Sequence, residues 1–219
     1  MLGVNGLVAS GFVDDPKAME ALAFTRKLFV EDKIVPQSEA PDFFYNEQVA
    51  FWQSTPVYAD VIKEKSAGLE WGVMPHPYFV TPVVQTDSFH LGVNATSKNA
   101  QAAAQLVAYL SSTESSLAMA QDMGVLASRK SALDKQSQFA SGPLAVFRET
   151  ILNWAVPRPV TAGFSEFDAL YSKMITDICT GAPLETTVSK AVADMDRQLA
   201  RYASIVNAAS MLLAEMAMS

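Results

Sequence analysis

The sequence predicts a helix-rich α/β fold whose sheets are built from strands that lie far apart along the chain. Half of the 219 residues are hydrophobic, which is enough for a substantial core and excludes general disorder. Apolar residues recur at three-to-four spacing in most segments, as on one face of a helix. Only short, single strand-like stretches lie between these segments, so each strand must find its partner elsewhere in the chain.

Helices are expected wherever a capping residue precedes an amphipathic stretch. Asp15 and Pro16 begin the first, and Thr55 and Pro56 begin another in the same way. Asn99 is expected to cap a third, because its side-chain oxygen can accept from a free amide of the first turn. The predicted helices lie in residues 14–33, 54–66, 99–112, 113–124, 142–155, 164–181 and 184–219, with a short helix before residue 49.

Strands are expected in the apolar stretches between these helices. Residues 49–52 alternate as a half-buried strand does, and residues 69–77 form a strand that ends in prolines. A further strand containing Leu91 to Val93 runs directly into the helix at Asn99. Residues 156–163 are expected to be irregular, because two prolines exclude a helix there.

Charge and terminal composition narrow the function classes. The net charge is −7 and the 16 Lys and Arg residues are scattered, which disfavours a nucleic-acid partner. The first ten residues lack the basic start of a signal peptide. No stretch is clearly long and apolar enough to span a bilayer; residues 205–219 come nearest but contain Asn207 and Glu215.

The sequence offers little for catalysis or metal binding. Cys179 is the only cysteine, lies in a predicted helix and is interpreted as a buried, inert thiol. His76 and His90 are the only histidines and lie far from it in the sequence, so neither a thiol–base pair nor a zinc site is expected. Phosphate-loop, dinucleotide and nucleophile-elbow motifs are absent. We therefore expect that the protein is not an enzyme and that it binds no cofactor and no metal.

Five segments in order resemble the C-terminal half of the sugar-binding extracellular solute-binding proteins of ABC importers. These segments are EALAFTRKLFVEDKIVP, FFYNEQVAFWQSTPVYADVIKE, LEWGVMPHP, LGVNATSKNAQAAAQLVAYLSSTESSLAMAQDMGVLASRKSAL and PRPVTAGFSEFDALY. The fourth is the most specific, since the family also begins a helix with Ser-Lys-Asn after a strand that crosses between lobes. The alternative is an unrelated helical α/β domain with a coincidental cap.

The resemblance implies a partial type II periplasmic-binding-protein-like fold. Residues 1–83 and 131–202 would belong to the second lobe, and residues 84–130 would be an excursion into the first lobe. The family's first half has no counterpart here, so the chain is expected to be truncated relative to it. Two details depart from the family pattern: Val57 stands where an aromatic residue often follows the proline turn, and QTDSF replaces a frequent glycine pair.

Family position supplies the candidate ligand-binding residues. Sugar clefts use aromatic faces for stacking and carboxylates or amides for hydroxyl groups. The candidates are Trp52, Tyr58, Asp87, Ser88, Phe164 and Glu166. Each also has a structural interpretation, since the aromatic residues can pack in a core and Asp87 can cap a turn. Arg158 either holds a carboxylate or lies in solvent.

The C-terminal segment, residues 203–219, extends beyond the resemblance as a helical tail. An apolar seam with four-three spacing follows residues 188–216, as in a coiled coil. Its positions are Val188, Val192, Met195, Leu199, Tyr202, Val206, Ala209, Leu213 and Met216. Such an apolar surface must be covered by the chain's own domain, by a second copy, or by whatever replaces the missing lobe. We expect a homo-oligomer that is held through this helix.

The favoured function is non-catalytic binding of a small molecule, and a carbohydrate is the class that the resemblance implies. The alternative is an oligomeric interaction or structural protein that has lost ligand binding. A small-molecule solute is one expected partner, and a membrane permease is a partner only within a full-length context. The resemblance implies a periplasmic or cell-surface location, but no signal peptide is evident, so the compartment is left open.

Overall fold

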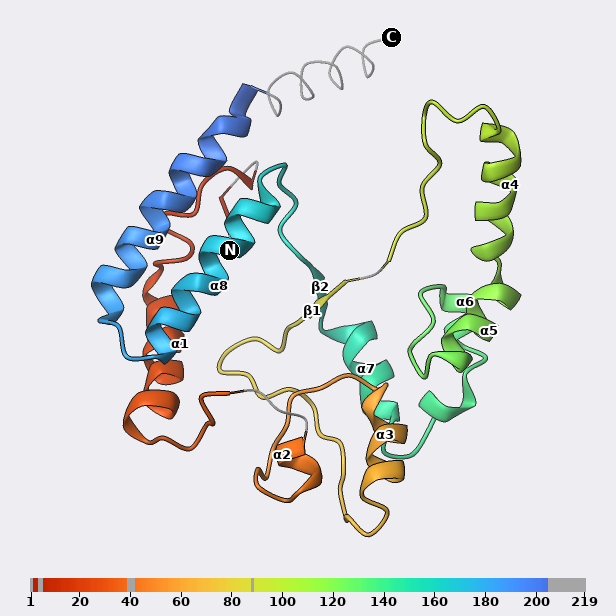
Figure 1. The fold of residues 1–219 in the computed structure, drawn as a ribbon, viewed down its shortest axis with the longest axis horizontal. Coiled ribbons are helices and arrows are strands. Elements are labelled where there is room, and N and C mark those ends of the chain that lie inside the picture. The colour runs from red at the N-terminus through yellow and green to blue at the C-terminus, as the bar shows by residue number, and fades with distance from the viewer. Residues whose placement is uncertain (1, 4–5, 39–41, 88, 205–219) are drawn as a thin grey trace. The chain divides into compact units, whose positions relative to one another are not determined.

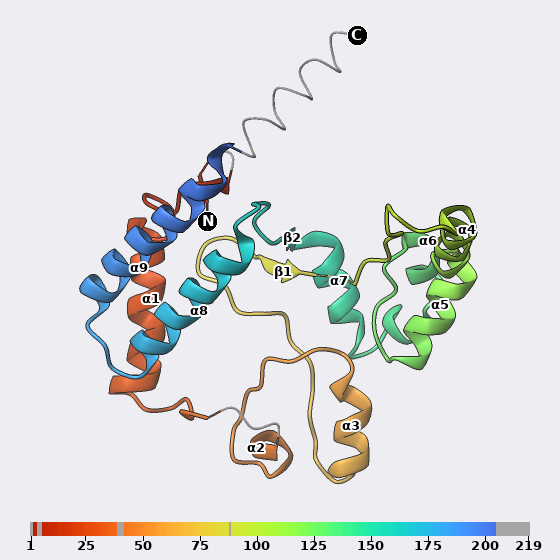
Figure 2. The same cartoon turned by 45° about the horizontal axis from the view of Figure 1, so that its top comes forward.

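The computed structural model describes residues 2–3, 6–38, 42–87 and 89–204, and most of its elements are helices (Figures 1 and 2). The elements are α1 Pro16–Arg26, a π-helix Lys27–Glu31, α2 Asp42–Tyr45, α3 Tyr58–Lys65, β1 Val84–Thr86, α4 Ala100–Leu110, α5 Thr113–Asp122, α6 Lys130–Leu133, a 3-10 helix Ser137–Phe139, α7 Ala145–Asn153, β2 Ala155–Pro157, α8 Phe164–Cys179, α9 Leu184–Leu199 and a 3-10 helix Ala200–Tyr202. The predicted helices are confirmed as far as residue 204, and so is the helix-rich class.

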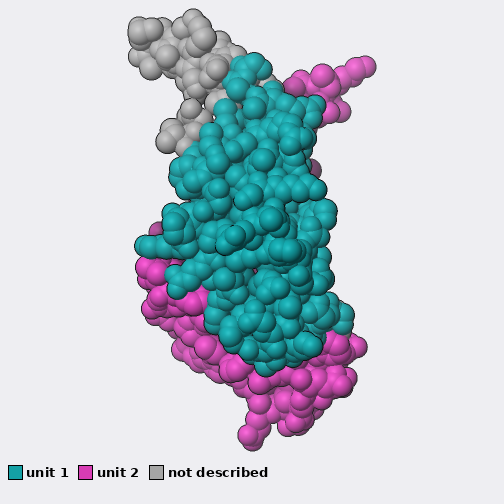
Figure 3. Space-filling model, turned by 90° about the vertical axis from the view of Figure 1, so that its left-hand side faces the viewer, with its two compact units in different colours: residues 1–39, 159–219 teal, residues 40–158 magenta. Residues whose placement is uncertain are grey.

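The chain divides into two compact units, which Figure 3 shows in different colours. Unit 1 contains residues 1–39 and 159–219, and unit 2 contains residues 40–158. Each unit has a hydrophobic cluster of its own. The lobe boundaries near residues 83, 130 and 202 that the resemblance implies stay a prediction.

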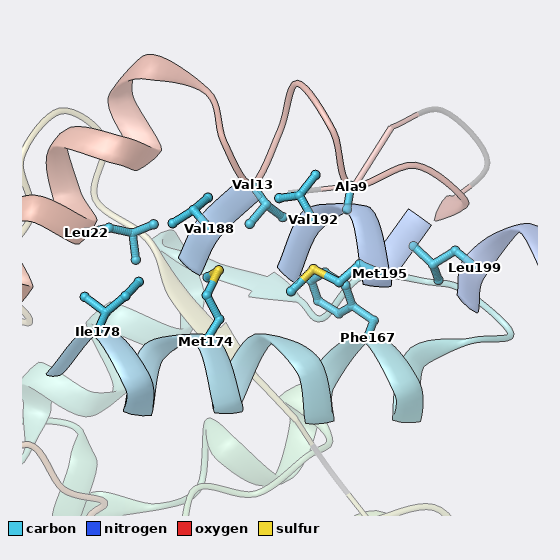
Figure 4. Close-up of a cluster of buried hydrophobic side chains, with 10 residues drawn as sticks. All are labelled: Ala9, Val13, Leu22, Phe167, Met174, Ile178, Val188, Val192, Met195 and Leu199. Carbon is cyan, nitrogen blue, oxygen red and sulfur yellow. The ribbon is translucent and has the colours of Figure 1, made fainter. Parts of the chain in front are cut away.

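Unit 1 is built from α1, α8 and α9. Helices α8 and α9 lie side by side, and α1 packs against α8 (Figures 1 and 2). Their buried side chains meet in one cluster, drawn in Figure 4: Ala9, Val13, Leu22, Phe167, Met174, Ile178, Val188, Val192, Met195 and Leu199. Four of these are the first four positions of the predicted seam, so that part of the seam packs inside its own unit. The positions from Val206 onward lie outside the described residues.

Polar side chains hold the ends of unit 1's elements in place. Asp15 caps α1 as predicted, because its carboxylate accepts a hydrogen bond from the Lys17 amide at 2.9 Å. Asp196 on α9 accepts one from the Ala9 amide at 2.6 Å, which ties the N-terminal segment to α9. Cys179 ends α8 and is buried as expected, and this burial raises the pKa of its thiol.

Unit 2 contains a two-stranded parallel sheet. Val84 pairs with Ala155, Gln85 with Val156 and Thr86 with Pro157. The expectation that residues 156–163 are wholly irregular is therefore wrong at its start. Proline excludes a helix there but is tolerated at the end of an edge strand.

A small core in unit 2 lies between α5, α6 and α7. It contains Ala120, Ala127, Ala132 and Leu133, with Ile151 packed against it. Gly124 ends α5 at φ 66°, and the Val125 amide donates back to the Ala120 carbonyl at 2.9 Å, as in a Schellman cap. The buried Gln136 side chain then secures the loop that follows. It accepts from the Ala127 amide at 2.8 Å and donates to the Val125 carbonyl at 2.9 Å.

Three predicted strands are absent from the described chain. Residues 49–52, 69–77 and 91–93 have no ladder partner there, because the sheet contains β1 and β2 alone. In the first stretch Trp52 packs against other aromatic rings instead. In the second, prolines remove backbone donors. The third, 91–93, has an alternating strand pattern but no neighbouring strand among the described residues.

The starts of three predicted helices also differ in detail. The side chain of Asn99 makes no capping bond; Asn99 begins α4 through its carbonyl, which accepts from the Ala103 amide at 3.0 Å. The helix predicted to start at Thr113 is capped by Ser112, whose hydroxyl accepts from the Ser115 amide. Helix α3 begins at Tyr58, after a turn at the predicted Thr55–Pro56 start. There the Tyr58 amide donates to the Thr55 carbonyl at 3.2 Å.

Candidate functional site

Two of the sequence-predicted residues meet in an aromatic cluster in unit 2. The ring centroids of Trp52 and Tyr58 are 4.7 Å apart, with an edge-on interplanar angle of 67°. Phe44 and Tyr45 of α2 each lie 5.8 Å from Trp52. These four residues form the aromatic cluster. Trp52 and Tyr58 were predicted from the sequence, and Phe44 and Tyr45 were not. The run DFFY just before Trp52 was the available signal, and it was interpreted only as a short helix.

The backbone around α2 and α3 sets the positions of these rings. After α2 the chain turns back at Glu47, which takes the left-handed conformation at φ 58°. The Gln48 amide donates to the Phe43 carbonyl at 2.8 Å and closes that turn. Ser66, at the end of α3, donates from its hydroxyl to the Tyr45 carbonyl at 3.0 Å. A non-glycine residue in this conformation costs roughly 1–3 kcal/mol, so surrounding contacts must hold the turn that leads to Trp52.

Tyr45 is the most buried member of the aromatic cluster. Its hydroxyl is buried and has no hydrogen-bond partner among the described residues. Burial is the main reason that the pKa of Tyr45 is raised, with Tyr58 and Asp42 adding to the effect. The Lys65 ammonium lies 5.3 Å from the centre of its ring, close enough for a cation–π contact. A buried hydroxyl without a partner is uncommon in folded proteins.

Asp87 forms a second group, with Arg158. The parallel register places Asp87 directly after β1 and Arg158 directly after β2. One Arg158 guanidinium nitrogen lies 3.2 Å from a carboxylate oxygen of Asp87, and both side chains are about half exposed. Arg158 therefore holds a carboxylate, which decides between the two interpretations of that residue. An exposed pair of this kind contributes little to stability.

Phe164 and Glu166 lie apart from these groups, in the first turn of α8 in unit 1. Phe164 packs on the unit 1 core, with its ring centroid 6.5 Å from that of Phe167. The Tyr202 hydroxyl donates to a carboxylate oxygen of Glu166 at 2.6 Å, and this bond lowers the pKa of Glu166. Both side chains thus have structural partners within unit 1. Ser88 lies outside the described residues.

Other candidate sites are weak in the described part of the chain. An open groove in unit 1, between the π-helix and the end of α8, contains none of the predicted residues. No three His, Cys, Asp or Glu side chains of the described ranges are grouped to hold a metal ion. None of the helices within those ranges is long and apolar enough to cross a bilayer. The aromatic cluster and the Asp87–Arg158 pair therefore remain the candidate groups of unit 2.

Comparison with known families matches residues 2–145 to bacterial extracellular solute-binding proteins. The chain belongs to this family. The match includes the aromatic cluster, Asp87 and helix α4. The search of curated proteins finds no match.

Solved structures of solute-binding proteins share the fold. The ABC substrate-binding protein Lmo0181 from Listeria monocytogenes, solved with cycloalternan, is 16% identical with a TM-score of 0.74, and the match covers 91% of this chain and 53% of that one. The maltose-maltodextrin binding protein of Alicyclobacillus acidocaldarius is 21% identical with a TM-score of 0.66, over 84% and 51% of the two chains. This solute-binding family member thus spans about half the length of the solved structures that it matches.

Proposed function

We propose that this chain binds a carbohydrate without catalysis, as the solute-recognition component of an ABC importer. Family membership supports solute binding, and the two solved neighbours are named for sugar ligands or a sugar complex. The observation that carries the carbohydrate class is the aromatic cluster, in which a half-buried Trp52 lies against Tyr58 and Tyr45. Aromatic faces combined with a few polar groups are typical of such pockets.

Asp87 and Arg158 are a second group of unit 2 that we propose supplies polar contacts to the sugar. Ionised carboxylates accept and guanidinium groups donate, so the pair can bind both the hydrogens and the oxygens of sugar hydroxyls. Hydrogen bonds to charged groups contribute about 1.5–3 kcal/mol in net terms. The upper end of this range, together with about 1 kcal/mol from contact with one aromatic ring, gives affinity near 1 mM, which corresponds to about −4.1 kcal/mol.

A ligand titration of the 219-residue chain tests the proposal. Maltotriose and cycloalternan, added up to about 10 mM, are expected to raise the thermal midpoint and to titrate near 1 mM. Trp52→Ala should abolish the shift, and Asp87→Asn should weaken it. Absence of any shift with both sugars would contradict the carbohydrate class, and micromolar binding would contradict the weak two-group site.

Matched variants separate ligand contact from general destabilisation. Trp71→Ala removes another half-buried tryptophan of unit 2 that lies outside the aromatic cluster. Asp134→Asn removes a carboxylate whose oxygen lies 2.6 Å from an Arg148 guanidinium nitrogen, in an ion pair elsewhere in unit 2. Both variants are expected to show the same sugar-dependent rise in thermal midpoint as the wild type. If these controls lose the sugar-dependent rise as completely as Trp52→Ala and Asp87→Asn do, the loss is due to general destabilisation. The assignment of the site then fails.

The alternative function, an oligomeric interaction protein without ligand binding, is favoured by one observation. Apolar side chains of α4 and of the segment before it are exposed in unit 2. Oligomerisation and sugar binding are separate properties, so a stable oligomer that shows no sugar titration would favour this alternative over the carbohydrate site.

A further inference from the structure

Helix α3 carries a residue of the aromatic cluster at one end and a polar contact at the other. Tyr58, Ile62 and Ser66 follow one another at four-residue spacing, which places them on the same side of the helix and of the residue that ends it. Ile62, between the other two, is only 4% exposed. Ser66 lies about 12 Å along the helix axis from Tyr58, at a rise of about 1.5 Å per residue.

The end of α3 is attached to α2. The Ser66 hydroxyl donates to the Tyr45 carbonyl at 3.0 Å, and this bond is partly buried. The neighbouring Lys65 ammonium lies 5.3 Å from the centre of the Tyr45 ring and 3.8 Å from a carboxylate oxygen of Asp42. Because Lys65 and Asp42 are both exposed, their ion pair contributes little. The hydrogen bond of Ser66 is therefore the more specific attachment.

This hydrogen bond completes a closed loop of contacts around the aromatic cluster. The ring of Trp52 lies 5.8 Å from that of Tyr45 and 4.7 Å from that of Tyr58. Helix α3 connects Tyr58 to Ser66, which returns to Tyr45. Residues 46–57, which carry Trp52, form neither helix nor strand, so no backbone ladder fixes that ring. Its position depends on the side-chain contacts that close the loop.

We propose that Ser66 is a positioning residue for the sugar site. Its bond to the Tyr45 carbonyl sets the separation of Trp52 and Tyr58 from about two helical turns away, without touching the ligand. This inference rests on the proposed function, in which the aromatic cluster binds the sugar. Groups that bind a ligand must be held within about 0.5 Å of their productive positions, and the residues that support them supply that precision.

Sugar titrations of the 219-residue chain with substitutions at Ser66 test the proposal. Ser66→Ala should raise the maltotriose concentration at the half-maximal thermal shift about two- to tenfold, the change that corresponds to one net hydrogen bond. Ser66→Thr keeps the hydroxyl and should retain the wild-type value. Ser131→Ala is the matched control, since the Ser131 hydroxyl lies 2.7 Å from that of Thr113 in another part of unit 2. This control should leave the titration unchanged.

Trp52 fluorescence supplies a readout that does not require sugar. The other tryptophans are Trp71 and Trp154, so a Trp71→Phe/Trp154→Phe background leaves Trp52 as the only emitter of this type. In that background Ser66→Ala should raise the acrylamide quenching constant of Trp52, because the neighbouring rings cover it less. Ser131→Ala should leave the quenching constant unchanged.

The two readouts must change together. The proposal is overturned if Ser66→Ala alters neither of them or only one, or if Ser131→Ala or Ser66→Thr weakens sugar binding as much as Ser66→Ala does. If neither maltotriose nor cycloalternan shifts the wild type, the proposed function fails, and a positioning role for a sugar fails with it. A wild type that responds to sugar, with unchanged affinity in Ser66→Ala, overturns the positioning role alone.

Discussion

Helices α9 and α4 differ in a way that their composition does not predict. Helix α9 carries five charged residues, and yet Val188, Val192, Met195 and Leu199 are almost completely buried. Helix α4 carries no charge and buries no residue. In α9 the apolar stripe faces α8 and the N-terminal segment, whereas the described chain offers α4 little beyond α5. Periodicity therefore identifies which face is apolar, but burial depends on what the rest of the fold places against it.

The largest expected effect tests this contrast directly, with the same substitution in both helices. Leu199→Ala should lower the free energy of unfolding by about 2–5 kcal/mol, because Leu199 is fully buried and its loss leaves a cavity. Leu106→Ala should change it by less than about 0.5 kcal/mol, because the side chain is exposed and alanine is a good helix former. Urea denaturation followed by circular dichroism, at a concentration where the chain is monomeric, measures both. Equal losses would show that α4 is covered within its own unit.

A smaller change in the free energy of unfolding is expected when the polar contacts of Gln136 in the unit 2 core are removed. Gln136→Ala should lower the free energy of unfolding by about 2 kcal/mol, because it leaves the Ala127 amide and the Val125 carbonyl without their partner. The matched control is Gln105→Ala on α4, where the glutamine is exposed. That control should be near neutral. A Gln136 variant as stable as the control would mean that water replaces both bonds without loss.

Much of the fold could be predicted because its signals are local. Asp15 and Pro16 begin α1, and the four-three pattern of residues 188–199 defines the buried face of α9, all from nearby residues. The strands could not be predicted in the same way. Residues 91–93 carry a strand pattern without a described partner, while Ala155–Pro157 pair with a segment about 70 residues away despite a proline. Pairing depends on distant segments, which a local pattern does not contain.

Some residues of the candidate site were predicted from the sequence, but most of their contacts were not. Trp52 and Tyr58 came from family position, and the structure brings their rings together. Phe44 and Tyr45 were missed because a short aromatic run in a helix is also an ordinary core pattern. The partner of Asp87 followed only from the parallel register, which no sequence signal indicated. Glu166 binds Tyr202 for a similar reason, since α9 brings residues 36 positions apart into contact.

The smallest expected effect is a pH dependence in unit 1 that is absent from the α4 region. The Tyr202 hydroxyl donates to the ionised Glu166, which lowers the pKa of Glu166 from its ordinary 4.5 and raises that of Tyr202 from 10.0. A lowered carboxyl pKa stabilises the fold above the unfolded value, and this contribution is lost as the pH falls through the folded value. A raised tyrosine pKa stabilises the fold below the unfolded value, and this contribution is lost as the pH rises through the folded value.

Both effects come from one hydrogen bond, so Tyr202→Phe should remove them together. The difference in thermal midpoint between wild type and Tyr202→Phe is expected to be largest between about pH 5 and pH 9 and to shrink on either side. Tyr109→Phe is the control, because Tyr109 is exposed on α4, and its difference should be flat across the same range. A flat profile for Tyr202→Phe would mean that packing of the ring against Gly163, rather than the bond to Glu166, holds this end of α9.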